Sequence, residues 1–191
     1  MKPSAWFLAA CTKPTSISSK NFDFQPHLGG VLVRLAPLTE AGFTGLLSCA
    51  QNQDTWADYP NPNMQNPDGL KAWFPNGVTR AKALLITDQL SGQTIGTTRF
   101  YQVPNDPRGI GIGFTFLHAH FRRQGQTNTE LKALMFAHAF MHFERIWFHV
   151  LPHNLRSQAA VRKLGVHDHG EQKLKLTDTA QIYRCFSTIK T

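Results

Sequence analysis

The clearest pattern in the chain is a change of hydrophobic period around a polar segment at residues 122–130. Before it, residues 111–117 form a short apolar run interrupted by glycines, which predicts a strand. After it, apolar side chains and histidines recur with a period near 3.6, which predicts an amphipathic helix over residues 128–142. Thr127 and Glu130 have the spacing of a capping box, so we expect the helix to start at Thr127 or Asn128.

Shorter patterns on both sides predict the remaining elements. Further strands are expected at residues 31–38, 82–87, 94–103, 145–151, 166–174 and 180–188. Further helices are expected at residues 39–51 with Thr39 as cap, at 68–74 before Pro75-Asn76-Gly77, and at 154–164. The order of elements predicts one α/β (α+β) domain at residues 21–191, with a mixed sheet of about seven strands and about four helices.

The charge of the chain points to a polyanionic ligand or partner. The formal net charge is +8, and the 9 histidines are not counted in it. Nucleic acid, an anionic membrane and a phosphate-bearing cofactor all fit this charge. Cys11, Cys49 and Cys185 are odd in number and lack disulfide or metal spacing, which favours a reduced, cytoplasmic setting.

Residues 1–20 form an N-terminal extension that mimics a lipoprotein signal, because Leu8-Ala9-Ala10 precedes Cys11. The apolar run is shorter than the roughly 7 residues that a secretory core needs. We therefore expect an extension that is either ordered or frayed rather than an export signal, and the hydropathy of the chain predicts no membrane span.

The polar segment has the features of a phosphate site. Arg122 and Arg123 precede Gly125, and the predicted helix begins directly afterwards. The backbone N–H groups of a first helical turn are unpaired, and the helix dipole favours negative charge at that end. Residues 122–130 are therefore expected to bind an anion such as a phosphate.

These residues resemble a known family. Arg122-x-x-Gly125-x-Thr127 is similar to the Q/R-x-x-G-x-G/A pyrophosphate loop of the GNAT superfamily of acetyl-coenzyme A-dependent N-acetyltransferases. Residues 125–132 look like the G-x-x-N-x-E-x-K helix start of its branch that includes the ribosomal-protein amino-terminal acetyltransferases. A second block, Asn154-Leu155-Arg156-Ser157 followed by Lys163-Leu164-Gly165, is similar to the N-x-x-S…K-L-G segment of that branch.

The resemblance implies the GNAT fold, with a mostly antiparallel sheet splayed in its middle, and acetyl-coenzyme A as cosubstrate. Gly109, Gly111 and Gly113 in the central strand are expected to mark a bulge, a close backbone approach or the slot for the pantetheine arm. The expected coenzyme-binding residues are Phe116, Leu117, Arg122, Arg123, Gln124, Gly125, Gln126, Thr127, Asn128, Asn154 and Ser157.

The resemblance also suggests catalytic candidates. Asn154 is expected to hold the pantetheine or a water, and Ser157 to protonate the leaving thiolate, unless Ser157 only bonds to its own helix backbone. Asp58 is a candidate to bind or deprotonate the amine. Two positions depart from the family pattern: Thr127 replaces the final Gly or Ala of the loop, and Val161 stands where many members have a tyrosine acid.

Two other chemistries are less well supported. His138 and His142 share a helix face, but no carboxylate or cysteine cluster completes a metal site, so we expect no metal. The arginines lack interleaved aromatics, and most flank the two coenzyme blocks, so we do not expect nucleic acid as the partner. The acceptor is expected to be a primary amine, either a protein N-terminus or a small molecule, and the chain a monomer or homodimer. A non-catalytic acyl-coenzyme A-binding or RNA-associated protein remains the alternative.

Overall fold

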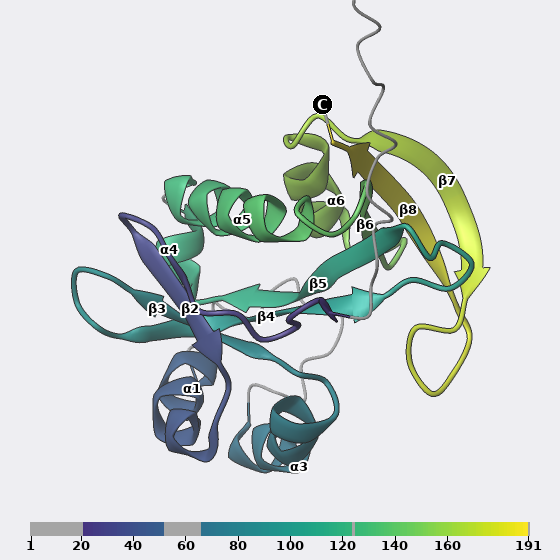
Figure 1. Cartoon of the computed structure of the whole chain (residues 1–191). Helices are drawn as coiled ribbons and strands as arrows, with labels where there is room; N and C mark the ends of the chain where they lie inside the picture. Colours follow the sequence, from purple (N-terminus) through teal and green to yellow (C-terminus); the bar gives the residue numbers. More distant parts are fainter. Residues whose placement is uncertain (1–20, 52–65, 124, 191) are drawn as a thin grey trace, which may run out of the picture.

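The computed structural model describes residues 21–51, 66–123 and 125–190. Its centre is one eight-stranded sheet in the order β1-β2-β3-β4-β5-β6-β8-β7 (Figure 1). The strands are β1 Leu28–Gly29, β2 Val33–Pro37, β3 Leu84–Asp88, β4 Thr94–Gln102, β5 Gly109–Leu117, β6 Arg145–Val150, β7 His167–Leu174 and β8 Gln181–Ile189. Only the β5–β6 pair is parallel, so the sheet is mixed and mostly antiparallel as predicted, with the short β1 as an additional strand.

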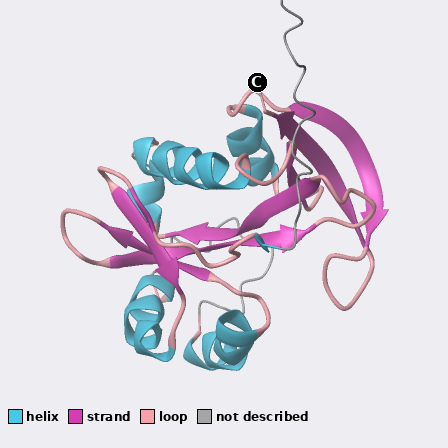
Figure 2. Ribbon diagram, in the orientation of Figure 1, coloured by secondary structure: helices cyan, strands magenta, loops and turns pink. Residues whose placement is uncertain are grey.

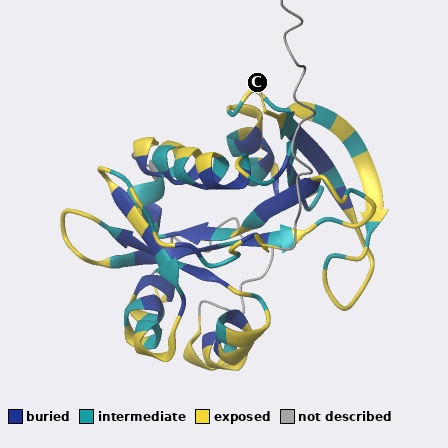
Figure 3. Ribbon diagram, viewed as in Figure 1, coloured by how far each residue is buried: buried dark blue, intermediate teal, exposed yellow. Residues whose placement is uncertain are grey.

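Helices cover both faces of the sheet (Figures 1 and 2). The helices are η2 Glu40–Gly42, α1 Phe43–Ala50, α3 Pro67–Thr79, α4 Ala119–Arg123, α5 Gln126–Ala139 and α6 Leu155–Arg162. Helices α4, α5 and α6 lie on one face, and α1 and α3 lie on the other. The buried residues accordingly form two clusters, one beneath α5 and one around α1 and α3 (Figure 3).

The sheet opens between its two parallel strands. β5 pairs with β6 only where Gly109–Gly111 face Arg145–Trp147. Beyond that point β5 continues to Leu117, still paired with β4, and β6 continues to Val150, still paired with β8. The edges of β5 and β6 that face the opening therefore carry backbone groups without a ladder partner. This is the splayed sheet that the sequence resemblance implied.

A bulge in β5 bends the strand at this opening. The β4–β5 register shifts between Thr97 and Arg99, and Phe114 in the opposing stretch has a φ of 50°. Side-chain burial is consistent with an extra residue here, because Phe114 is 40% exposed whereas Phe116 is buried. The bulge therefore turns the second half of β5 away from β6.

Three predicted helix boundaries are wrong. Thr39 makes no side-chain cap bond and precedes η2 rather than α1. Helix α3 continues through Pro75 to Thr79. Pro75 removes only one hydrogen bond, the one to the carbonyl of Lys71, which is exposed. The ring of Trp73 packs on Gly77 and stabilises the turn that contains the proline. Helix α5 begins at Gln126, with Gly125 as its N-cap at a φ of 72°.

The capping box is also wrong, because Glu130 contacts another part of the chain. Its carboxylate accepts hydrogen bonds from the backbone N–H groups of Val31, Leu32 and Val33 at 2.7, 2.7 and 2.8 Å. Gly30 packs against the same carboxylate, where a Cβ would lie 2.5 Å from the Glu130 Cδ. Glu130 thus fastens the β1–β2 turn to α5 and is fully occupied in doing so.

Candidate active site

A cleft of about 1510 Å³ passes through the opening between β5 and β6. Its walls include residues 112–117 of β5 and residues 148–151 at the end of β6. On one face of the sheet the cleft is lined by residues of α5 and α6, and on the other face by residues of α3. A ligand bound at the start of α5 can therefore reach a second ligand that enters from the α3 side.

The residues predicted to bind an anion lie at the start of α5. Arg122, Gly125 and Asn128 line the cleft. Among the described residues, no acceptor is recorded for the backbone N–H groups of residues 126–128, while the N–H of Thr129 turns back to the Gly125 carbonyl at 3.3 Å. The N–H groups of a first helical turn, together with a nearby arginine, are suited to binding an anion.

The other residues predicted for this loop do not line the cleft or lie outside the described residues. Thr127 is 3% exposed and is not among the residues that line the cleft, and Gln126 is exposed. Arg123 ends α4, and Gln124 lies outside the described residues. The left-handed φ of Gly125 is the conformation that glycine adopts without strain, and nothing lies within 4 Å of its missing Cβ.

The second predicted block forms the wall contributed by α6. Asn154 is the N-cap of this helix, and its Oδ1 accepts from the Ser157 N–H at 3.1 Å. Asn154, Ser157 and Val161 all line the cleft, as do Phe116 and Leu117 on β5. The structure thus brings both coenzyme blocks to one cleft, whereas Asp58 lies outside the described residues.

Lys132 ends the helix-start motif of residues 125–132, but its burial in this cleft was not predicted from the sequence. Lys132 of α5 is 7% exposed, and its Nζ donates to the Thr115 Oγ1 at 3.2 Å. Burial lowers the pKa of Lys132 to about 8. A lysine between Leu131 and Met135, on the apolar stripe of a predicted helix, was the available signal.

A tyrosine–histidine pair on the α3 side of the sheet was also overlooked. The Tyr101 hydroxyl and the His149 Nδ1 are hydrogen-bonded at 2.8 Å, and both residues line the cleft. The Tyr101 ring reaches β6 by lying across β5 at Gly111, where a Cβ would overlap it. The close approach of the ring is therefore the reason for glycine at position 111. In the same pair, burial lowers the pKa of His149 to about 4.

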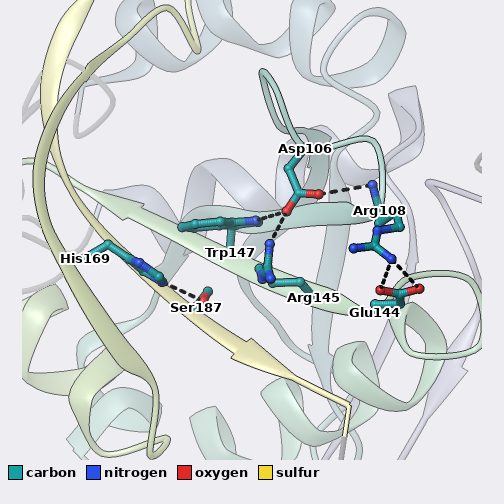
Figure 4. A network of polar contacts seen from close by, with 7 residues as sticks. All are labelled: Asp106, Arg108, Glu144, Arg145, Trp147, His169 and Ser187. Atoms are coloured by element: carbon teal, nitrogen blue, oxygen red, sulfur yellow. Dashed lines mark hydrogen bonds and ion pairs between the residues drawn. The ribbon is translucent and has the colours of Figure 1, made fainter.

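A polar network connects the β4–β5 turn to β6, at the end where β5 and β6 are still paired (Figure 4). Asp106, in the β4–β5 turn, accepts from the Trp147 Nε1 at 2.7 Å and from Arg145 at 3.0 Å, and both donors lie on β6. Burial acts to raise the pKa of Asp106, but these hydrogen bonds outweigh it and lower the pKa. The network holds β5 and β6 together at the point from which they diverge.

Other ligand classes find little support in the described part of the chain. It contains no group of three or more His, Cys, Asp or Glu residues arranged to hold a metal ion. Of the two histidines predicted to share a helix face, His138 on α5 is used internally, because its Nε2 lies 2.8 Å from the carbonyl oxygen of Asp23, and His142 lies beyond the end of α5. None of the described helices has the length and apolar character needed to cross a membrane.

Comparisons with known proteins agree with this geometry. A family model described as an acetyltransferase (GNAT) domain matches residues 33–167. A GNAT-family protein from Chromobacterium violaceum superposes with a TM-score of 0.73 at 20% identity, covering 99% of this chain and 96% of that one. A GCN5-related N-acetyltransferase from Brucella melitensis superposes with a TM-score of 0.73 at 18% identity, and the match covers 88% of this chain and 83% of that one. A ribosomal-protein-S5-alanine acetyltransferase from Vibrio fischeri superposes with a TM-score of 0.56 at 16% identity, and the match covers 86% of this chain and 97% of that one. No curated protein matches the sequence.

Proposed function

Because the chain belongs to the GNAT family of acetyltransferases, we propose that it transfers the acetyl group of acetyl-coenzyme A to the amino terminus of a protein. Members of this family are acyltransferases that use acetyl-coenzyme A as cosubstrate. The observation that carries the proposal is the cleft, which joins an anion site at the start of α5 to a second entrance beside α3. Such a cleft can hold an acyl donor and an amine on opposite faces of the sheet, with the reacting atoms in the opening.

The coenzyme occupies the α5–α6 side in this proposal. Its phosphates bind to Arg122, to Arg123 and to the N–H groups that follow Gly125, and Gln124 completes the loop. The pantetheine arm enters between β5 and β6, beside Phe116 and Leu117, and backbone N–H groups of β5 hydrogen-bond it and the thioester oxygen. All charged side chains that line this side among the described residues are cations, namely Arg122, Lys132, Arg156 and Lys163.

The catalytic roles remain those predicted from the sequence motifs. Asn154 orients the first turn of α6 through its bond to Ser157, so its loss would disturb this wall of the cleft. The hydroxyl of Ser157 is a candidate to protonate the thiolate, and its position on the cleft wall supports this role. Asp58 remains a candidate to bind the amine.

The α3 side suits an ammonium group as acceptor. Asp178 is the one acidic residue among the described residues that line the cleft. The lining also includes the rings of Trp73, Tyr101 and Tyr183, whereas the ring of Phe114 is covered by the guanidinium of Arg99 at 3.6 Å. A carboxylate and aromatic faces both attract an ammonium group, and the amine must then lose a proton before it attacks.

The choice of a protein terminus rests on the sequence motifs of residues 125–132 and 154–165. The buried, free Cys49 and Cys185 support our assignment to the cytoplasm.

The coenzyme site is tested by thermal unfolding with coenzyme A. At a ligand concentration of about 100 times Kd, the native state gains about 2.7 kcal/mol, which raises the melting temperature by roughly 5–10 °C. Gly125→Val should abolish this shift, because the side chain blocks the approach of a phosphate to the backbone. Gly92→Val is the matched control, since Gly92 has the same backbone conformation (φ 70°), has no neighbour within 4 Å of its missing Cβ and does not line the cleft. Equal shifts in both variants would contradict the coenzyme site.

The acceptor is tested by following the release of free thiol from acetyl-coenzyme A with a panel of amines. Peptides with a free amino terminus should support turnover, and the same peptides with a blocked terminus should not. Turnover with amino sugars or amino-acid conjugates alone would replace the proposed acceptor by a small molecule and leave the coenzyme site standing. Binding of coenzyme A without thiol release with any amine would contradict the catalytic proposal.

A further inference from the structure

Lys132 bridges the gap between the two diverging strands. Its Nζ donates to Thr115 on β5 at 3.2 Å and lies 5.9 Å from the ring centre of Phe148 on β6. All three residues line the cleft. The ammonium group is therefore at the opening itself, on its α5 side, rather than at the surface of the helix.

The charge of this group has no counter-charge within the described parts of the chain. No carboxylate among the described residues pairs with Nζ, and the other charged residues lining this side of the cleft, Arg122, Arg156 and Lys163, are also cations. Burial is the cause of its lowered pKa, yet with a value of about 8 roughly nine-tenths of the group stays charged at pH 7. A methionine would fill the space without this cost, so the retained cation indicates that negative charge arises beside it during function.

That negative charge is not a phosphate of the coenzyme. The phosphates belong at the start of α5, and Lys132 lies seven residues beyond Gly125, which is about 10 Å along the helix axis. The pantetheine arm between these points is uncharged. The charge that appears at the opening must therefore form in the reaction, either on the thioester oxygen or on the departing sulfur.

The two sites of developing charge have different partners available. The oxygen can accept hydrogen bonds from backbone N–H groups of β5 beyond Gly111, where this strand no longer pairs with β6. The departing sulfur needs a proton as well as a positive charge, and a buried ammonium supplies both. A donor with a pKa near 8 is also well matched to an alkyl thiol, whose pKa is about 8.5, because the proton then moves with little change in free energy.

We propose that Lys132 is the acid that stabilises and protonates the coenzyme A thiolate as it leaves, an assignment that rests on the proposed function. The amine nitrogen bonds to the thioester carbon, the carbon–sulfur bond breaks, and the sulfur keeps the electron pair. A proton passes from the Lys132 ammonium to this sulfur. The proton that the attacking amine loses goes to solvent, and solvent returns one to Lys132. In this scheme Lys132 replaces Ser157 as the proton donor, and the hydroxyl of Ser157 only lines the wall of the cleft.

The first test measures the thiol of bound coenzyme A and needs no acceptor. The pKa of this thiol is followed by the ultraviolet absorbance of the thiolate across a pH series at saturating protein. In the wild type it should lie about one unit or more below that of free coenzyme A, because the adjacent cation stabilises the thiolate. Lys132→Met should remove the shift, and Lys132→Arg should keep it. The same thiol pKa in the wild type and in Lys132→Met would overturn the proposal.

The second test separates charge from proton transfer during turnover. With an amine that supports thiol release, both Lys132→Met and Lys132→Arg should lower kcat by about 100-fold, because arginine keeps the charge but does not give up a proton. The melting shift with coenzyme A should remain in both variants. The loss of kcat above pH 8 in the wild type should be absent from both variants. Lys173→Met, an exposed lysine on β7 outside the cleft, is the control and should behave as wild type.

Three outcomes would contradict the assignment and distinguish it from the proposed function. If Lys132→Met turns over within threefold of wild type while Ser157→Ala loses about 100-fold, the acid is Ser157. If mass spectrometry finds Lys132 itself acetylated, the group is an acceptor and not a proton donor. If coenzyme A neither binds nor stabilises the wild type, the proposed function fails, and the role of Lys132 fails with it.

Discussion

The hydrogen bonds of Glu130 allow a prediction of stability that is independent of chemistry. Its Oε1 accepts from the Val31 N–H, and its Oε2 accepts from those of Leu32 and Val33. In Glu130→Gln the amide oxygen can replace one of these oxygens, while the NH2 group would face a backbone donor. One bond is lost and the remaining bonds lose their charge assistance, so the free energy of unfolding should fall by about 2 kcal/mol.

The magnitude allows for solvent at this site. The three donors are not equally buried, because Val31 is 85% exposed whereas Val33 is buried, so the outer bonds contribute less than the inner one. A loss of about 2 kcal/mol lowers the melting temperature of a domain of this size by roughly 4–8 °C. Glu130→Ala loses all three bonds and should cost roughly twice as much.

The assay is urea unfolding, in which the midpoint should fall and the slope stay constant. Glu144→Gln is the matched control, because it removes a carboxylate from an exposed ion pair with Arg108 and should cost less than about 1 kcal/mol. Gly30→Ala should displace the same carboxylate, so its effect should not add to that of Glu130→Ala. Equal midpoints for Glu130→Gln and Glu144→Gln, or a loss of kcat in Glu130→Gln without a loss of stability, would refute the reasoning.

Two further predictions concern the cleft. Gly111→Ala should displace the Tyr101 ring, break its hydrogen bond to His149 and lower the free energy of unfolding by about 2 kcal/mol; an unchanged unfolding curve would contradict the close approach. For Lys132, burial lowers the pKa in the folded state to about 8, below the ordinary value of 10.5. The buried charge therefore destabilises the fold fully below pH 8 and progressively less as the pH rises to 10.5. Lys132→Met should therefore be more stable than wild type at pH 7, by about 3 kcal/mol at most, and this advantage should shrink between pH 8 and pH 10.5 in paired thermal scans.

Much of the fold was predictable because its signals are local. The period of apolar residues located β2, β4, β5, β6, β8 and the body of α5, since a strand or helix buries one face whatever it packs against. The glycine and the helix start on which the predicted anion site depends are also local, because Gly125 is the residue directly before α5. The second coenzyme block, at residues 154–165, was found by motif and lies on the same cleft as the first.

The errors arose where a side-chain contact outweighs the local sequence signal. Glu130 matched a capping box, but three N–H groups that lie 97 to 99 residues away provide a stronger set of donors. Pro75 was expected to end a helix, but the packing of Trp73 on Gly77 continues it. Local patterns predict what a segment can form on its own, whereas contacts across the fold decide which of these alternatives is adopted.

The sequence by itself therefore determined the elements and their order, and it predicts an anion site at the start of α5. Only the tertiary structure decided where the sheet opens, because that depends on the short β5–β6 pairing, the bulge at Phe114 and the contacts of Asp106. The same closure places Lys132 between two strands and Tyr101 across a glycine. Burial of a charge and the approach of a ring to a backbone are properties of surfaces brought together in space, and no spacing along the chain encodes them directly.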